Sequence, residues 1–108
     1  MKIRVSRALS EERKAEKEAD LAWADAVKGR DGWFCVVCGV SERLNAHHIL
    51  PREVKEFKYV VDNGITLCVT HHKFSRELSA HNNSFAFLLW FMVNRKAQFE
   101  RLRLMWLI

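Results

Sequence analysis

Two closely spaced pairs of metal-binding side chains stand out in the sequence. Cys35 and Cys38 form a CxxC pair, and Cys68 with His71 forms a CxxH pair further along the chain. Each pair presents two ligands from one tight turn, and four protein ligands leave no position open for water, as structural zinc sites require. The pattern therefore predicts a structural Zn²⁺ bound by these four residues. The alternative is that the cysteines are ordinary buried side chains.

Three further histidines lie next to these candidate ligands. His47 and His48 adjoin each other at the end of a predicted strand, and His72 directly follows the candidate ligand His71. Successive side chains of a strand point to opposite faces, so His47 and His48 should not both bind one ion in regular geometry. We therefore expect a second site in which one of them binds a metal ion while the other acts on a water molecule.

An N-terminal helix is predicted before the first cysteine pair. Residues 10–28 place alanines, Trp23 and Val27 on one apolar stripe with helical spacing. Ser10 is suited to cap this helix, and Gly29 is expected to end it. The helix leads directly into the cysteine region, without a linker.

The rest of the chain is predicted to form short strands and one more long helix. Strands are expected over residues 44–50 and 64–67, separated by a loop over residues 51–63, and a short helix is expected to begin near residue 70. Residues 84 to about 104 are dense in apolar side chains and predict a C-terminal helix. This order predicts an α+β fold.

Length and composition limit the class of protein. The chain has 108 residues, which is room for one domain spanning residues 1–108, and 49% of them are hydrophobic. Three cysteines without a recognisable secretory signal indicate reduced thiols, so we expect a cytoplasmic protein, in a host cell if the chain is phage-encoded. The uncharged stretch over residues 84–94 is much shorter than the roughly 20 residues that cross a bilayer, so no membrane association is expected.

The two cysteine pairs and the segments around the histidines resemble the HNH endonuclease family. The matching segments are AHHILP at residues 46–51 and DNGITLCVTHH at residues 62–72, and the resemblance covers about residues 33–81. The positions that name the family fall on His48, Asn63 and His72. Asn63 follows His48 by fifteen residues, and His72 follows Asn63 by nine, as in the family. The resemblance implies a zinc-stapled ββα-metal core, flanked here by the two long helices, in a small phage-type protein.

The resemblance also implies roles for these residues in hydrolysis of a phosphodiester. His48 would be the general base that deprotonates water, and a neutral imidazole suits that task at cellular pH. His47 and His72 would bind a divalent ion that stabilises the leaving 3′ oxygen. Asn63 would orient the base by tying the long loop to its strand, although an Asn-Gly pair is also compatible with plain turn chemistry.

One position departs from the family pattern. Several HNH nucleases have a further histidine one helical turn beyond the position of His72, and here that position holds Arg76. Two protein ligands would leave an open site that favours a hard ion such as Mg²⁺ or Mn²⁺. Arg76 is then a candidate phosphate contact. His81 is expected to be a surface residue, and Tyr59 a packing residue.

The net charge of +5 is compatible with a DNA partner and equally with ordinary surface charge. In the loop between the strands, Arg52, Lys55 and Lys58 are the expected phosphate contacts, together with Arg76. A monomer is the default. By analogy with small phage proteins of the family, a role in phage DNA processing beside packaging proteins is a further expectation.

Two other functions remain open from the sequence. A non-catalytic zinc module that binds nucleic acid or a protein would keep the Cys3His set, but it would not need His47, His48 and His72 at HNH intervals. A nuclease that acts on RNA, or only within a larger assembly, is the other alternative.

Overall fold

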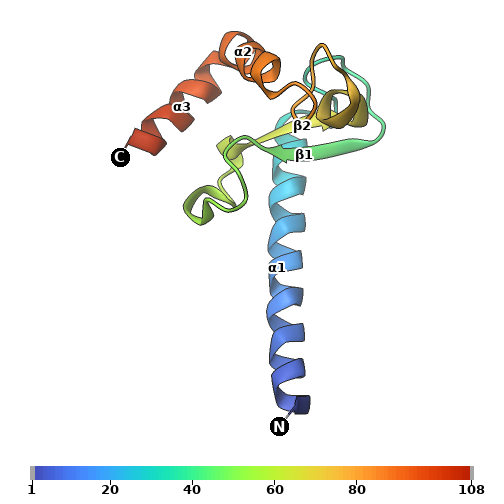
Figure 1. The fold of residues 1–108 in the computed structure, drawn as a ribbon, viewed down its shortest axis with the longest axis vertical. Helices are drawn as coiled ribbons and strands as arrows, with labels where there is room; N and C mark the ends of the chain where they lie inside the picture. The colour runs from blue at the N-terminus through green and yellow to red at the C-terminus, as the bar shows by residue number, and fades with distance from the viewer. Residues whose placement is uncertain (1, 108) are drawn as a thin grey trace.

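The computed structural model describes residues 2–107, with side chains from residue 8 onward. A two-stranded antiparallel sheet, β1 (Leu44–His48) and β2 (Gly64–Cys68), crosses the C-terminal end of the long helix α1 (Lys2–Arg30). A five-residue π-helical turn, η3 (Thr70–Phe74), follows β2, and the helices α2 (Ser84–Asn94) and α3 (Lys96–Leu107) complete the chain (Figure 1). This is the predicted α+β class with a ββα core.

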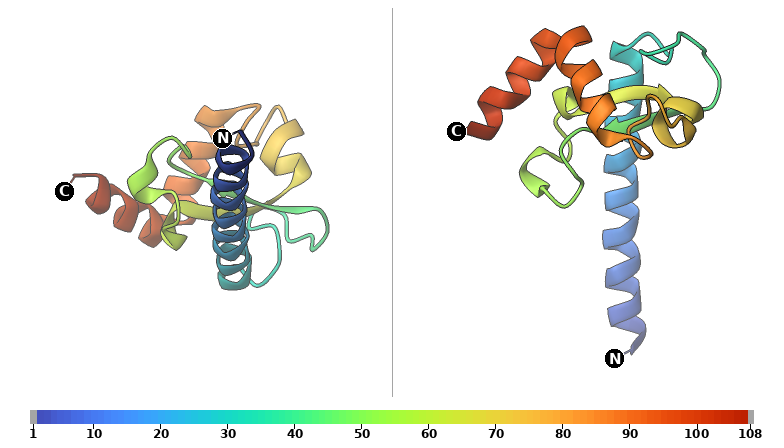
Figure 2. Two further views of the ribbon diagram at one scale, coloured as in Figure 1. Left: turned by 90° about the horizontal axis from the view of Figure 1, so that it is seen from below. Right: turned by 45° about the horizontal axis from the view of Figure 1, so that its top comes forward.

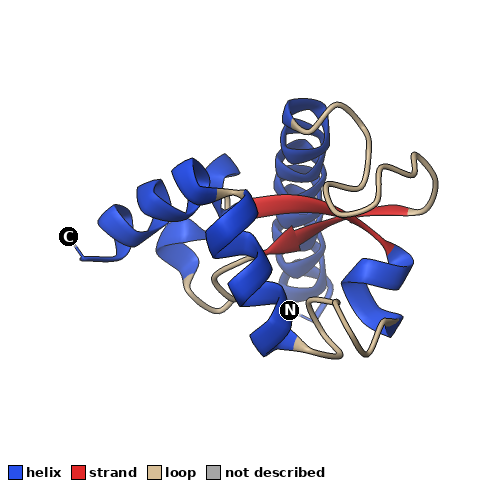
Figure 3. Ribbon diagram, turned by 90° about the horizontal axis from the view of Figure 1, so that it is seen from above, coloured by secondary structure: helices blue, strands red, loops and turns tan. Residues whose placement is uncertain are grey.

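The sheet lies between α1 on one face and α2 on the other (Figure 3). Alternation along β2 assigns its side chains to the two faces. Ile65 and Leu67 are fully buried in a core with Phe87 and Phe91 of α2. On the opposite face, the hydroxyl of Thr66 donates to the carbonyl of Val27 in α1. The strand pair therefore separates two distinct environments.

Gly64 allows α1 to approach the sheet closely. A Cβ atom on Gly64 would overlap the Val27 side chain and lie 2.6 Å from Cζ2 of Trp23. Real Cβ atoms do not come so close to carbon neighbours. Trp23 and Val27 are both buried at this contact, so the glycine of the Asn-Gly pair is required by packing of the helix on β2.

The N-terminal helix is longer than predicted at both ends. It begins at Lys2 rather than at residue 10, so Ser10 lies within the helix and is not its cap. Residues 2–9 contain neither Gly nor Pro, and nothing in them opposes helix propagation. Gly29 is inside the helix, which continues to Arg30. Figures 1 and 2 show the N-terminal half of α1 projecting away from the rest of the protein.

The C-terminal region forms two helices where one was predicted. The Asn83 side chain caps α2 by accepting a hydrogen bond from the N–H of Ala86. The helix ends at Asn94, and Arg95 leaves the helical conformation with φ −124° and ψ 46°. The Asn94 amide donates to the carbonyl of Trp90, and the Arg95 guanidinium binds Gln98 and Asp31. These side-chain bonds favour the break over a continuous helix.

Asp31 connects the end of α1 to β2 and to Arg95, the residue between α2 and α3. Its side chain is 1% exposed. It accepts hydrogen bonds from the backbone N–H of Thr66 and from the guanidinium groups of Arg30 and Arg95. This carboxylate thereby joins three segments that are distant in the sequence. Among the described residues, no helix combines the length and the apolar character needed to cross a membrane.

Candidate metal sites and catalytic site

The four predicted zinc ligands converge at one end of the sheet. Cys35 and Cys38 lie on the turn between α1 and β1, Cys68 ends β2, and His71 belongs to η3. The Sγ atoms of Cys38 and Cys68 are 3.7 Å apart, and Nδ1 of His71 is 3.3 Å from Cys68 Sγ and 3.9 Å from Cys35 Sγ. All three cysteines are free thiols.

These separations fit a tetrahedral zinc ion. Zn–S bonds of about 2.3 Å and Zn–N bonds of about 2.0 Å place tetrahedral donors about 3.5–3.8 Å apart. Burial raises the pKa of the Cys35 thiol, but the backbone N–H groups of Cys68, Cys38 and Val37 outweigh burial and lower it. Donors that stabilise a thiolate are typical of the surroundings of a metal-binding cysteine. The cluster thus has the chemistry of a closed structural site.

A second cluster joins His47, His72 and His81. One ring nitrogen from each lies within 4.8 Å of the others, and Nε2 of His72 is 3.1 Å from Nε2 of His81. The ring of His47 is in edge contact with both other rings, 5.1 Å between centroids. The facing Nε2 atoms of His72 and His81 could share a hydrogen bond or could both bind one metal ion. The third ring nitrogen nearby, from His47, favours binding of a metal ion.

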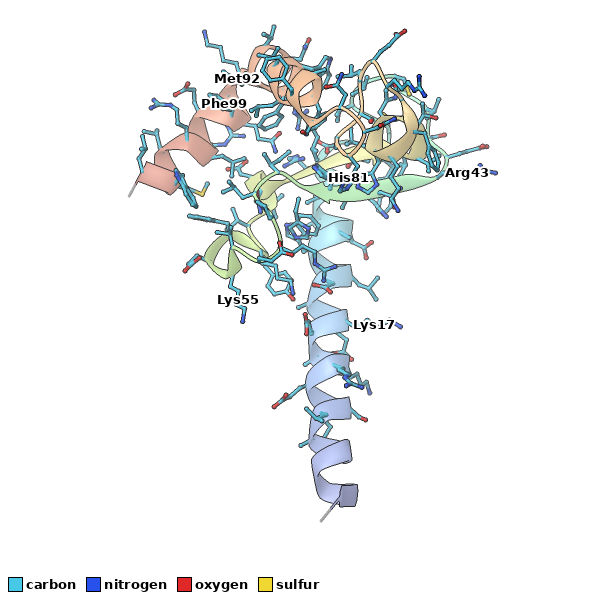
Figure 4. All side chains as sticks on the ribbon, viewed as in Figure 1. Lys17, Arg43, Lys55, His81, Met92 and Phe99 are labelled. Atoms are coloured by element: carbon cyan, nitrogen blue, oxygen red, sulfur yellow. The ribbon has the colours of Figure 1, made fainter. Side chains whose placement is uncertain are left out.

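His81 is exposed, as expected of a surface residue, but it does not lie apart from the other histidines. The helical turn η3 ends at Phe74, so Arg76 does not extend it by a further turn, and the chain folds back instead. Backbone hydrogen bonds from Ala80 to His71 and from His81 to His72 align the returning segment with η3. His81 then lies beside the strands (Figure 4), and its ring nitrogen is within 4.8 Å of ring nitrogens of His47 and His72.

Polar side chains stabilise the segment over residues 75–82, which folds back from η3. The Ser75 hydroxyl accepts from the N–H of Leu78, and the buried Ser79 hydroxyl donates to the carbonyl of Ser75. Ser79 also accepts from the N–H of Asn82. The serines and asparagines around His81 are turn formers, and they were the sequence feature that could have indicated the reversal.

Burial keeps His47 and His72 of this cluster neutral. It lowers the pKa of His47 to about 3, with the charges of His72, His81 and His48 acting in the same direction. Burial and the charges of His81 and Lys73 lower the pKa of His72 to about 4. Nδ1 of His72 is buried without a hydrogen-bond partner among the described residues. A neutral His47, and a neutral His72 with an unpaired Nδ1, fit a set that binds a cation. Mg²⁺ or Mn²⁺ was expected for a site with two protein ligands. The structure instead brings three histidine nitrogens together.

His48 lies on the opposite face of β1, as the alternation of strand residues predicts. Its ring is stacked on the Trp23 indole, 3.8 Å between centroids and 7° between planes. Nε2 is 2.9 Å from the carbonyl oxygen of Lys58. A carbonyl only accepts, so Nε2 carries the proton and Nδ1 of the neutral ring has a free lone pair. Burial lowers the pKa of His48 below its usual 6.5, although the bond to Lys58 opposes this shift.

Asn63 ties the two ends of the long loop together. Its side chain is fully buried; Oδ1 accepts from the N–H of Leu50, and Nδ2 donates to the carbonyls of Leu50 and Phe57. The backbone carbonyl of Asn63 accepts from Ile49. The loop held in this way contains Lys58, whose carbonyl fixes the tautomer of His48. These contacts exceed what a simple Asn-Gly turn requires.

The predicted phosphate contacts are spread over the surface. Arg52 lines a cleft of about 1260 Å³ that runs between α1 and α2. Lys55 points away from the body of the protein (Figure 4), and Arg76 is exposed beyond η3. Lys58 forms an ion pair with Glu16 at 2.9 Å, so α1 neutralises part of the loop charge. Among the four, Arg52 alone lines the cleft as the structure describes it.

The cleft brings both groups of histidines to one solvent-accessible space. Its walls include His47, His48, His72 and His81, together with apolar side chains from both flanking helices: Leu21, Trp23 and Ala24 of α1, and Phe85, Phe87 and Leu88 of α2. Trp23 and His81 contact the predicted site residues, although the sequence had indicated only a packing position for Trp23 and a surface position for His81.

Comparison with known families agrees with this geometry. Residues 35–78 match the family described as HNH endonuclease. Neither a curated protein nor a solved structure matches the chain. The matched segment contains the four converging zinc-type ligands, His47, His48, Asn63 and His72. Residues 35–78 are thus similar to the HNH endonuclease family, and the Cys3His cluster that they contain fits the zinc-binding variant of that family.

Proposed function

We propose that the protein is a metal-dependent endonuclease that hydrolyses phosphodiester bonds in DNA, with His48 as the general base. The proposal rests on the end of β1, where two adjacent histidines lie on opposite faces of the strand and have different neighbours. His48 presents a free Nδ1 on one face, and His47 joins a cluster of three histidines on the other. Both line one cleft that is open to a substrate.

In the reaction, a water molecule in the cleft gives a proton to Nδ1 of His48 as its oxygen attacks phosphorus. The new P–O bond forms while the bond from phosphorus to the 3′ oxygen breaks, and the products are a 5′ phosphate and a 3′ hydroxyl that takes its proton from solvent. The lowered pKa of His48 keeps the ring able to accept the proton at neutral pH. Asn63 acts as a positioning residue through the loop that contains Lys58.

His47, His72 and His81 are the proposed ligands of the catalytic ion. A cation bound there would supply positive charge that offsets the charge developing on the leaving 3′ oxygen. Three imidazole nitrogens favour a transition-metal ion such as Mn²⁺, Co²⁺, Ni²⁺ or Zn²⁺ over Mg²⁺, which prefers oxygen ligands. Cys35, Cys38, Cys68 and His71 would hold the structural zinc.

The proposed contacts with the DNA backbone are Arg52, Lys55, Lys58 and Arg76. Arg52 is best placed, since it lines the cleft, and its ion pair with Asp20 at 3.1 Å is exposed to water. Exposed pairs of this kind are weak, so a phosphate could replace the carboxylate as partner. We further propose that residues 1–108 form one domain, because α1 and α2 both complete the walls of the cleft.

Nicking of supercoiled plasmid by the zinc-loaded protein tests the proposal. The assay compares EDTA with Mg²⁺, Mn²⁺, Co²⁺, Ni²⁺ and Zn²⁺, for the wild type, His48→Ala and the surface control Lys96→Ala. We expect metal-dependent nicking that His48→Ala abolishes and Lys96→Ala retains. Equal activity in His48→Ala would refute the assignment of the base. A folded wild type that cuts neither DNA nor RNA with any ion would favour the non-catalytic zinc module instead.

A further inference from the structure

The proposed base touches a residue that lies outside the segment matched to the family. Trp23 belongs to α1, whereas the match begins at Cys35. Its indole covers one face of the His48 ring, with a centroid separation of 3.8 Å and an angle of only 7° between the planes. Such a nearly parallel contact restricts tilting of the imidazole.

Trp23 is itself held in a fixed orientation. Its side chain is 6% exposed, and its Nε1–H donates to the carbonyl of Val60 at 2.9 Å. Gly64, directly opposite His48 in the sheet, leaves room for the indole against β2. The indole is therefore locked by a hydrogen bond at its edge and by packing beneath it, so it is a rigid surface for the histidine.

The two contacts of His48 act on different degrees of freedom. The hydrogen bond from Nε2 to the Lys58 carbonyl fixes one edge of the ring but leaves it free to tilt about that bond. Stacking on Trp23 fixes the plane of the ring. Trp23 also bonds to Val60, two residues from Lys58, so the same side chain holds the loop that supplies the carbonyl.

We propose that Trp23 is a positioning residue for the general base, so that α1 is a functional part of the catalytic site. This inference rests on the proposed function of His48. It assigns to the N-terminal helix a task beyond covering the sheet, namely to hold Nδ1 of His48 toward the water it deprotonates. Small displacements of a catalytic group can lower a rate by up to about 100-fold.

The test compares Trp23→Leu and Trp23→Phe with Val27→Ala in the full zinc-loaded chain. Val27 is the matched control, since it is a fully buried residue of the same helix and also packs on Gly64. We expect Trp23→Leu to lower kcat for plasmid nicking by about 10- to 100-fold with little change in KM. Trp23→Phe, which keeps an aromatic face, should recover most of the loss. Val27→Ala should keep kcat at temperatures where it is folded.

Nuclear magnetic resonance supplies a readout that does not depend on activity. The ring protons of His48 should show an upfield ring-current shift in the wild type, part of it in Trp23→Phe, and none in Trp23→Leu. The proposal is overturned if the His48 shifts are the same in Trp23→Leu and the wild type. It is also overturned if Val27→Ala loses as much kcat as Trp23→Leu. If the wild type cuts nothing, the proposed function fails, and the shifts still decide whether Trp23 orients the ring.

Discussion

Replacing Asp31 with alanine is expected to lower the free energy of unfolding by about 3 kcal/mol. Alanine leaves the N–H of Thr66, a fully buried residue, without its acceptor, which alone costs about 1–3 kcal/mol. Two charge-assisted contacts, from Arg30 and Arg95, are lost as well. These guanidinium groups add less than fully buried charges would, because their side chains are 25% and 27% exposed and can reach water.

Urea unfolding of the zinc-loaded protein, followed by circular dichroism, measures this loss. The matched control is Asp62→Ala, which removes a paired carboxylate whose partner Arg101 is largely exposed. The control should change stability little, because exposed ion pairs are screened by water. The midpoint should fall for Asp31→Ala without a change in the slope of the transition. If the two variants unfold at the same urea concentration, the assigned role of Asp31 is wrong.

The effect of Asp31 should also depend on pH. Burial raises the pKa of this carboxyl, but hydrogen bonds from Arg30 and Thr66 and the charge of Arg30 outweigh burial and hold the pKa below its usual 3.8. A carboxyl with a depressed folded pKa stabilises the fold fully above its unfolded pKa, and this contribution is lost as pH falls through the folded pKa. The stability difference between wild type and Asp31→Ala should therefore be constant near neutral pH and shrink below about pH 4. A difference that stays constant through that acidic range would contradict this.

Three further changes test the sites. Removal of zinc with a chelator should abolish cooperative thermal unfolding, and so should Cys68→Ser, because a structural zinc contributes folding free energy directly. An unchanged thermal transition would argue against the zinc site. Asn63→Ala should lower the free energy of unfolding by about 2–3 kcal/mol in urea, because three hydrogen bonds of a fully buried side chain are lost, while the exposed amide change Asn94→Ala should have little effect. His81→Ala should weaken Ni²⁺ binding by at least tenfold in calorimetry, and Arg76→Ala should leave it unchanged; equal affinities would exclude His81 as a ligand.

Local spacing made much of the site predictable. The two zinc-ligand pairs are recognisable because each lies on a single tight turn, and the turns need only meet. His47 and His48 were separated correctly because alternation is a property of every strand. The positions of Asn63 and His72 came from the family resemblance, and the match over residues 35–78 agrees with it.

The features that the sequence did not reveal depend on contacts between distant residues. His81 reaches the cluster because residues 75–81 fold back toward η3. A hydrogen bond from Ser79 to Ser75 stabilises this segment, and the backbone N–H of His81 donates to the carbonyl of His72. One of the contacts that favour the end of α2 at Asn94 is the hydrogen bond from Arg95 to Asp31, sixty-four residues away. Neither contact leaves a periodic pattern in the sequence, so local propensity could not predict them.

The register of β1 against β2 determines which neighbours His47 and His48 each contact. His48 lies opposite Gly64 and His47 opposite Ile65. A slip of one residue would turn every side chain of β1 to the other face. The two rings are chemically identical, so after such a slip each would meet the neighbours of the other. Which imidazole would serve as the proposed base and which as the proposed ligand therefore depends on the strand alignment rather than on the residue type, and a one-residue change of register would exchange the surroundings of the two rings without changing either histidine.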